Sequence, residues 1–253
     1  MSAAGTLVRR AVKTAALPAG LARGLGPRDA VVLLYHRVGP GRSQIETDPG
    51  VFADQMAIVA ERGRATGIDR AIAGDGGTVV TFDDGTRDFH ERALPVIVDR
   101  GIPVVLYVAT AGIGAEGLTW SQLREAVGTG FVTVGSHTHH HVDLSRADPA
   151  TIVHELRVST ELIEDRLGVP CDDFAYPFAV GSVVAAPLVR RAFRSAVLRA
   201  WRTARWPFDP HAIGRIPVLR SDGIAFFRAK LAGRLDAEGA AYRLAGRGPW
   251  RTR

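Results

Sequence analysis

Two short polar segments of this chain carry residue types that could do chemistry together. Residues 81–85 read TFDDG, so two adjacent carboxylates follow an apolar run, and residues 137–141 read HTHHH. Adjacent carboxylates repel each other, and a divalent cation that binds carboxylate and imidazole ligands removes that repulsion. The two segments together therefore predict a metal site with a spare carboxylate beside it, which is the set of groups that metal-assisted hydrolysis requires.

The two aspartates are expected to have different roles. Asp83 and Asp84 point to opposite sides if the strand before them continues through both. One of them could then bind the metal while the other accepts a proton from the attacking water. The segment could instead be an acidic turn, because Asp-Gly is a common turn signal, but the downstream histidines favour the functional interpretation.

Spacing distinguishes the histidines of the second segment. His137 and His141 are four residues apart, which would place both imidazoles on one side of a helical turn. A set of one Asp and two His leaves coordination positions open for water and substrate, as a catalytic metal needs. Zn²⁺ is the divalent metal we expect, although Co, Ni, Mn or Fe would accept the same ligands.

Strand-like and helix-like segments alternate along most of the chain and must position these groups. Apolar runs that predict strands are found at residues 31–38, 78–82, 104–108, 131–135, 173–176, 195–198 and 215–219. The alternation predicts parallel β/α units in a single α/β domain. Because the candidate residues follow the carboxyl ends of predicted strands, where barrels collect their sites, we expect a barrel rather than an open sheet.

The composition is that of an ordinary globular protein with a basic charge balance. The 253 residues are 46% hydrophobic and 23% charged, with a net charge of +6. The Arg residues are spread along the chain and no nucleic-acid-binding motif is present, so we expect no nucleic-acid partner. The charge suits a phosphorylated substrate or an anionic membrane surface, or it reflects an Arg-rich composition alone. The single cysteine, Cys171, excludes an intrachain disulfide and fits a reducing compartment.

We divide the chain into a basic N-terminal arm (1–28), a barrel domain (29–245) and a loose tail (246–253). The arm has no uninterrupted apolar run of the kind found in secretory signals, and no stretch reaches the ~20 apolar residues of a membrane span. We therefore expect a cytoplasmic protein. Its arm would pack as a helix on the domain or make a weak contact with the inner face of the membrane.

TFDDG followed by SHTHHH resembles the polysaccharide deacetylases of carbohydrate esterase family four. Further segments match that family in order: LLYHRV at 33–38, FAYPF at 174–178 and RIPV at 215–218. The resemblance covers about residues 31–220. It implies a distorted, incomplete (β/α)7 barrel and a metal-dependent hydrolase that removes an acyl group, usually acetyl, from an amino sugar.

The resemblance also assigns roles to the two polar segments. It makes Asp83 the general base and Asp84 a metal ligand, with His137 and His141 at the two remaining ligand positions. Residues 139–140 fall at variable positions of the family motif, so both histidines are expected to be exposed and to bind no metal.

Hydrolysis of an amide also needs an acid that protonates the leaving amine, and His is the usual choice near neutral pH. Many relatives place this His near the C-terminus, but the last His of this chain is His211. A subgroup that resembles the poly-N-acetylglucosamine deacetylases places it on the first strand, where His36 matches. His36 is therefore the expected acid, with His211 as the alternative; His36 could otherwise be a structural histidine at a strand end.

Other candidates would bind or orient the reacting groups. The segment from Tyr176 to Phe178 resembles the motif whose aromatic residue donates its backbone N–H to the oxyanion. Arg215 could orient Asp83 through a charge-assisted hydrogen bond, or form a structural ion pair. Trp201 and Trp206 lie in the region where relatives wall the acetyl pocket.

The expected substrate is an amino-sugar polysaccharide, oligosaccharide, or lipid- or nucleotide-linked precursor. A cytoplasmic location favours a precursor of capsule or cell-envelope glycan over a finished extracellular polymer. Two alternatives remain open: a deformylase or cyclic-amide hydrolase on the same fold, and a non-catalytic carbohydrate-binding relative. The intact metal motif argues against the second of these.

Overall fold

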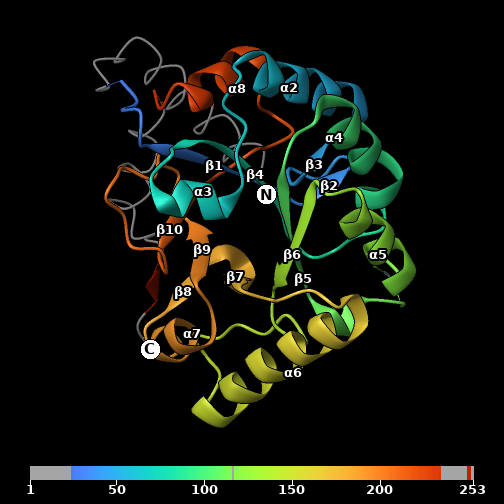
Figure 1. Cartoon of the computed structure of the whole chain (residues 1–253), viewed down its shortest axis with the longest axis vertical. Coiled ribbons are helices and arrows are strands. Elements are labelled where there is room, and N and C mark those ends of the chain that lie inside the picture. The colour runs from blue at the N-terminus through green and yellow to red at the C-terminus, as the bar shows by residue number, and fades with distance from the viewer. Residues whose placement is uncertain (1–23, 116, 235–249, 252–253) are drawn as a thin grey trace.

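The computed structural model describes residues 24–115, 117–234 and 250–251. Seven parallel strands close into a barrel in the order β1-β10-β9-β7-β6-β5-β4 (Figure 1). Their bounds are β1 Ala30–Tyr35, β4 Gly77–Phe82, β5 Val104–Val108, β6 Val132–Ser136, β7 Asp173–Ala175, β9 Ser195–Arg199 and β10 Ile213–Pro217. The predicted seven-stranded α/β barrel is therefore confirmed. Most of the predicted arm and tail, namely residues 1–23, 246–249 and 252–253, lies outside the described residues.

Helices connect the strands and cover the outside of the barrel (Figure 1). The α-helices are α2 Pro49–Glu61, α3 Ile68–Ala73, α4 Leu94–Arg100, α5 Trp120–Gly128, α6 Pro149–Leu167, α7 Ala186–Ala192 and α8 Ile224–Leu231. Single-turn elements are η1 Phe89–Ala93, η2 Thr110–Gly112 and η3 Pro177–Ala179. Two small sheets pair β2 Arg37–Val38 with β3 Glu46–Thr47, and β8 Gly181–Ser182 with β11 Trp250–Arg251.

The longest helix, α6, begins and ends at local sequence signals. The side chain of Asp148 caps its first turn by accepting hydrogen bonds from the backbone N–H groups of Ala150 and Thr151. Pro149 occupies the first helical position, where the missing N–H leaves no hydrogen bond unmade. Gly168 ends the helix with a φ of +68°, a conformation that glycine adopts without a steric penalty. These local signals fix the helix that will hold one side of the candidate site.

Strands β1, β4 and β5 are buried on both faces, which is why they read as continuous apolar runs. Successive side chains alternate between the barrel interior and the helix-covered exterior. The interior cluster consists mainly of small side chains, including Val32, Val79, Val105, Ala175 and Val197. The exterior cluster contains the larger rings of Tyr35, Phe52, Phe82 and Phe89, which pack against one another.

The same alternation carries the candidate residues to the carboxyl end of the interior. Two and four residues after Val32, β1 and its extension present Leu34 and His36, which line one pocket. Two and four residues after Val79, β4 and its extension present Thr81 and Asp83, and the side chain of Arg215 contacts both. The period of two therefore sorts residues from different strands onto one interior surface.

The barrel is irregular at two of its connections. β6 and β7 are joined by one register pair, Ser136 with Phe174. The segment from β9 to β10, residues 200–212, is fully described and contains no helix. These departures from a regular β/α repeat agree with the distorted barrel that the resemblance implies. Among the described residues, every helix is too short or too polar to cross a membrane.

Candidate active site and metal centre

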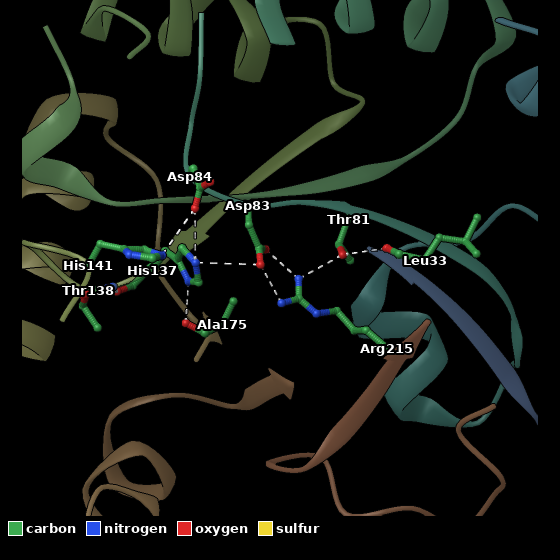
Figure 2. A network of polar contacts seen from close by, with 10 residues as sticks. Leu33, Thr81, Asp83, Asp84, His137, Thr138, His141, Ala175 and Arg215 are labelled. Atoms are coloured by element: carbon green, nitrogen blue, oxygen red, sulfur yellow. Dashed lines mark hydrogen bonds and ion pairs between the residues drawn. The ribbon is translucent and has the colours of Figure 1, made fainter. Parts of the chain in front are cut away.

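Asp83 lies inside the barrel in a two-pronged ion pair with Arg215. Nη1 and Nη2 of Arg215 donate to the two carboxylate oxygens of Asp83 at 2.6 and 2.7 Å (Figure 2). The guanidinium also donates to Thr81 Oγ1 at 3.2 Å, and that hydroxyl donates to the carbonyl oxygen of Leu33 at 2.7 Å. Both charged side chains are fully buried. Burial alone would raise the pKa of Asp83, but the charge of Arg215, together with that of His137, outweighs it and lowers the pKa to about 2.

Asp84 turns out of the strand and brings its carboxylate to the same place. β4 ends at Phe82, and Asp84 has a φ of +75°. Gly85 follows at +74°, and a Cβ there would lie 2.9 Å from Cγ1 of Val108. The two aspartates therefore do not point to opposite sides, as they would in a continuing strand. Asp83 Oδ2 and Asp84 Oδ1 lie 3.8 and 3.6 Å from the same atom, Nε2 of His137.

The loop after β6 brings the two predicted histidine ligands together without forming a helix. The expectation of a helical turn is wrong, because Thr138 and His141 have φ values of +66° and +57°. The rings of His137 and His141 are nevertheless 4.8 Å apart between centroids. Nδ1 of His137 donates to the carbonyl oxygen of Ala175 at 2.7 Å, which leaves Nε2 as the acceptor that faces the aspartates.

The donor atoms of Asp84, His137 and His141 fit a single divalent cation. They all lie within 4.8 Å of one another. Asp84 Oδ1 is 3.6 Å from His137 Nε2 and 3.4 Å from His141 Nε2. Two ligands about 2.1 Å from a tetrahedral ion would be about 3.4 Å apart, so these separations need little adjustment. Asp84 and His141 are about one-third exposed, which leaves the site open to water and substrate.

The other two histidines of this loop make contacts away from the metal-capable cluster. His140 is exposed as predicted, and its Nδ1 lies 2.7 Å from Glu155 Oε1. His139 is half-buried rather than exposed, and its Nδ1 lies 2.7 Å from Thr110 Oγ1. Neither belongs to the cluster of possible metal ligands among the described residues.

His36 lies at the carboxyl end of β1, beside the metal-capable cluster. The hydroxyl of Thr86 donates to its carbonyl oxygen at 3.5 Å, and Asp88 accepts a 2.6 Å hydrogen bond from the N–H of Val38. Burial lowers the pKa of His36, an effect that the nearby charges of Asp83 and Asp84 partly oppose. His36 is thus near enough to both aspartates for their charges to act on its pKa.

A pocket of about 390 Å³ opens beside His36, in the size range of small-ligand sites. Phe178 and Trp201 form its aromatic walls, and Arg199 contributes a polar wall. Phe178 is half exposed, has a φ of +57°, and packs its ring 4.8 Å from that of His141. The predicted Phe178 therefore lies beside a candidate ligand, and Trp201 lines the same pocket as Phe178 and His36.

Three sequence candidates are placed elsewhere. Side chains alternate along this segment, so Tyr176 points away from the barrel interior that Ala175 faces. Its ring packs against Phe174 and Trp250, and its N–H donates to Val197 O. A direct substrate contact by Tyr176 is therefore a wrong prediction.

Trp206 and His211 belong to the amino end of the barrel. Trp206 donates its N–H to Asp29, the residue before β1, and its ring lies under Arg28. Nε2 of His211 lies 2.8 Å from the carbonyl oxygen of Phe193, just before β9. The site is at the opposite end, so Trp206 does not wall its pocket and His211 does not reach its chemistry.

Sequence reasoning missed two contributors to the site. Thr81 holds Arg215, and its period-two relation to Asp83 was a usable signal. Glu155 accepts hydrogen bonds from the N–H groups of His139 and His140, and it lies on a helix far along the chain. Nothing local in the sequence connects that glutamate to the loop.

Comparisons with known proteins agree with this geometry. A family model described as polysaccharide deacetylase matches residues 73–207, just over half of the chain. The protein YxkH of Bacillus subtilis (strain 168) is 24% identical over 161 residues, which cover 60% of this chain and 57% of that protein. The poly-beta-1,6-N-acetyl-D-glucosamine N-deacetylase of Staphylococcus aureus (strain MRSA252) is 24% identical over 127 residues, which cover 45% of this chain and 44% of that enzyme.

A solved structure has a similar fold over most of this chain. IcaB from Ammonifex degensii matches with a TM-score of 0.71 and 25% identity, and the match covers 84% of this chain and 100% of that one. The chain spans about half the length of the curated relatives that it matches.

Proposed function

The chain belongs to the polysaccharide deacetylase family, and we propose that it is a metal-dependent hydrolase that removes an N-acetyl group from an amino sugar of a glycan. The observation that carries this proposal is the convergence of Asp83, Asp84, His137 and His141 on one small volume. That volume adjoins a pocket at the carboxyl end of the barrel, where such folds do their chemistry.

Asp84, His137 and His141 would hold the cation, for which Zn²⁺ is our first choice and Co, Ni, Mn or Fe are alternatives. When bound, such a cation polarises the amide carbonyl and lowers the pKa of water. The hydrogen bond from His137 Nδ1 to Ala175 O supports this assignment, because it fixes the tautomer in which Nε2 can act as a ligand.

Asp83 would accept the proton of the attacking water. Its low pKa keeps it ionised at any working pH, so it is always ready to accept a hydrogen bond from that water. Arg215 occupies one side of both carboxylate oxygens and thereby fixes the plane of the carboxylate. We assign Arg215 a positioning role, since it is completely buried behind Asp83.

His36 would protonate the leaving amine from the other side of the site. It shares a pocket with Phe178 and faces the charges of both aspartates, and the alternative acid, His211, is at the other end of the barrel. The backbone N–H of Phe178 would donate to the oxyanion that forms as water adds to the amide. The ring of Trp201 would wall the acyl pocket.

The substrate we propose is a glycan that contains N-acetylglucosamine, or a lipid- or nucleotide-linked precursor of one. The named activity of the Staphylococcus aureus relative supports this class, and so do the aromatic walls of the pocket, on which a sugar ring can stack. A cytoplasmic location and a membrane contact through the N-terminal arm remain predictions from the sequence.

The direct test is hydrolysis of N-acetylglucosamine oligomers by zinc-loaded protein, measured as acetate release together with new free amine. We expect both products in equal amounts and their loss after chelation, with Asp83→Asn as the matched inactive control. Faster release of formate from N-formyl oligomers would favour the deformylase alternative. Binding of the oligomer without any hydrolysis would overturn the proposal in favour of a non-catalytic module.

A further inference from the structure

A buried acidic side chain on α6 holds the loop that carries two of the candidate metal ligands. Glu155 is almost fully buried, with 3% of its side chain exposed. Its Oε2 accepts hydrogen bonds from the N–H groups of His139 and His140 at 2.9 and 2.7 Å. Its Oε1 lies 2.7 Å from Nδ1 of His140, which must carry the hydrogen because an ionised carboxylate only accepts. One carboxylate thus receives three donors from two consecutive residues.

The loop needs such contacts because two of its residues have an unfavourable backbone conformation. Thr138 and His141 both lie in the left-handed region, with φ values of +66° and +57°. Residues other than glycine stay in that region only where their surroundings determine it. Thr138 does not contribute through its hydroxyl, which is buried without a hydrogen-bond partner among the described residues. The two strained residues flank the pair that Glu155 binds.

The single-turn element η2 also holds this loop by hydrogen bonds. The N–H of Thr110 donates to Thr138 O at 3.2 Å, and the N–H of Ala111 donates to His139 O at 2.9 Å. These bonds satisfy carbonyl groups, whereas Glu155 satisfies N–H groups. η2 and Glu155 of α6 therefore hold overlapping parts of the loop, residues 138–139 and 139–140, and Glu155 is the charged group among these described contacts.

We propose that Glu155 is a positioning residue for the metal centre: by binding the His139 and His140 backbone, it holds His137 and His141 with their Nε2 atoms toward Asp84. The inference rests on the proposed function, since it takes these three residues to be the metal ligands. Glu155 itself is not a ligand, because its two oxygens are occupied by the loop.

The test is the zinc affinity of variants, measured by competition with a chromophoric chelator. Glu155→Ala removes all three acceptor contacts and should weaken zinc binding by 10- to 100-fold, as loss of an outer-shell partner does. Glu155→Gln keeps one carbonyl oxygen for the two N–H groups and should lie between Glu155→Ala and the wild type. If Glu155→Gln keeps part of the zinc affinity that Glu155→Ala loses, the loss comes from the missing acceptor and not from unfolding.

Two controls come from the same region. Glu161→Ala changes an exposed glutamate of α6 that pairs with Arg157, and it should bind zinc like the wild type. His140→Ala removes one of the three donors and leaves both backbone N–H groups, so it should weaken zinc binding less than Glu155→Ala.

A second readout needs no metal. In the zinc-free protein, the amide hydrogens of His139 and His140 should exchange slowly in the wild type and at least tenfold faster in Glu155→Gln. If Glu155→Ala fails to fold, the zinc affinity and amide exchange of Glu155→Gln test whether Glu155 positions the loop. Folded Glu155→Ala or Glu155→Gln protein that binds zinc within twofold of the wild type would overturn the inference and leave the proposed function intact. A wild type that binds no zinc would instead overturn the proposed metal site, and this inference with it.

Discussion

Each end of the barrel buries an aspartate in a bidentate ion pair with an arginine, yet among the described residues a cluster of possible metal ligands lies at one end alone. At the amino end, Asp173 accepts hydrogen bonds from Arg194 at 3.0 and 2.8 Å and from Ser195 Oγ at 2.6 Å. Inside the barrel and toward the carboxyl end, Asp83 accepts two from Arg215 at 2.6 and 2.7 Å.

The difference lies in what surrounds each pair. The oxygens of Asp173 are occupied by Arg194 and the hydroxyl of Ser195, and these bonds tie β7 to the start of β9. Asp83 Oδ2 also lies 3.8 Å from His137 Nε2, which belongs to the one cluster of possible metal ligands among the described residues. A buried Asp–Arg pair therefore does not identify a site, whereas its position beside converging acidic and imidazole groups does.

The largest expected contrast is between the two aspartates. Asp83→Asn should lower turnover by about 10²- to 10⁴-fold, because the amide cannot accept the proton of water. Asp173→Asn should leave turnover per folded molecule close to that of the wild type and lower the free energy of unfolding by about 1–3 kcal/mol, since it weakens a buried hydrogen-bonded group. Steady-state kinetics and urea unfolding of both variants measure this contrast. Equal losses of turnover would remove the distinction between the two ends.

The two candidate acids give the next contrast. His36→Ala should lower turnover by about 10²-fold or more, and His211→Ala should be close to neutral because it lies at the amino end. Burial holds the pKa of His36 below its usual 6.5, so its proton is lost as the pH rises through a value below 6.5. The kcat/KM of the wild type should therefore fall on the alkaline side from that value, and His36→Ala should lack this limb. If His211→Ala removed the alkaline limb instead, His211 and not His36 would be the acid.

The ion pair of Asp83 predicts a pH dependence of stability in the metal-free protein. Its pKa is about 2 in the folded chain, against an ordinary value of 3.8 for an aspartate. A depressed carboxyl pKa stabilises the fold above pH 3.8, and that stability is lost as the pH falls through 2. At about 1.4 kcal/mol per pKa unit, this contribution is roughly 2 kcal/mol. Urea unfolding between pH 2 and 5 should show it in the wild type and not in Asp83→Asn; parallel curves for the two proteins would contradict the assignment.

The smallest contrast concerns the two tryptophans. Trp201→Leu should raise KM by up to about tenfold with a smaller change in kcat, because it removes a wall of the pocket. Trp206→Leu, at the amino end, should leave KM unchanged. Initial rates at several oligomer concentrations measure both, and a KM effect confined to Trp206→Leu would relocate the acyl pocket.

Much of this geometry could be predicted from the sequence because it follows from strand period and strand ends. Asp83 and His36 come directly after buried apolar runs, so parallel pairing of β1 with β4 brings them to one end of the barrel. The family resemblance then identified Asp84, His137 and His141 as the set that the structure brings within 4.8 Å.

The wrong predictions concern segments whose conformation or position depends on tertiary contacts or on the direction in which the chain runs. The four-residue spacing of His137 and His141 suggested a helical turn, but η2 and Glu155 hold the loop in a conformation that no local signal predicts. The segment 200–212 runs from the carboxyl end of β9 to the amino end of β10. Trp201, early in that segment, therefore reaches the pocket, while Trp206 and His211 do not, and their nearness in sequence hides this separation.

The measurement that tests the central claim most directly is the zinc stoichiometry of single variants, determined by equilibrium dialysis with metal analysis. We expect about one zinc per chain in the wild type and in Asp83→Asn. Asp84→Ala, His137→Ala and His141→Ala should lose most of their zinc while they remain folded, since a three-ligand site loses its affinity with any one ligand. Full zinc content in those three variants, or its loss in Asp83→Asn alone, would contradict the division of the site into a metal-binding aspartate and a proton-accepting one.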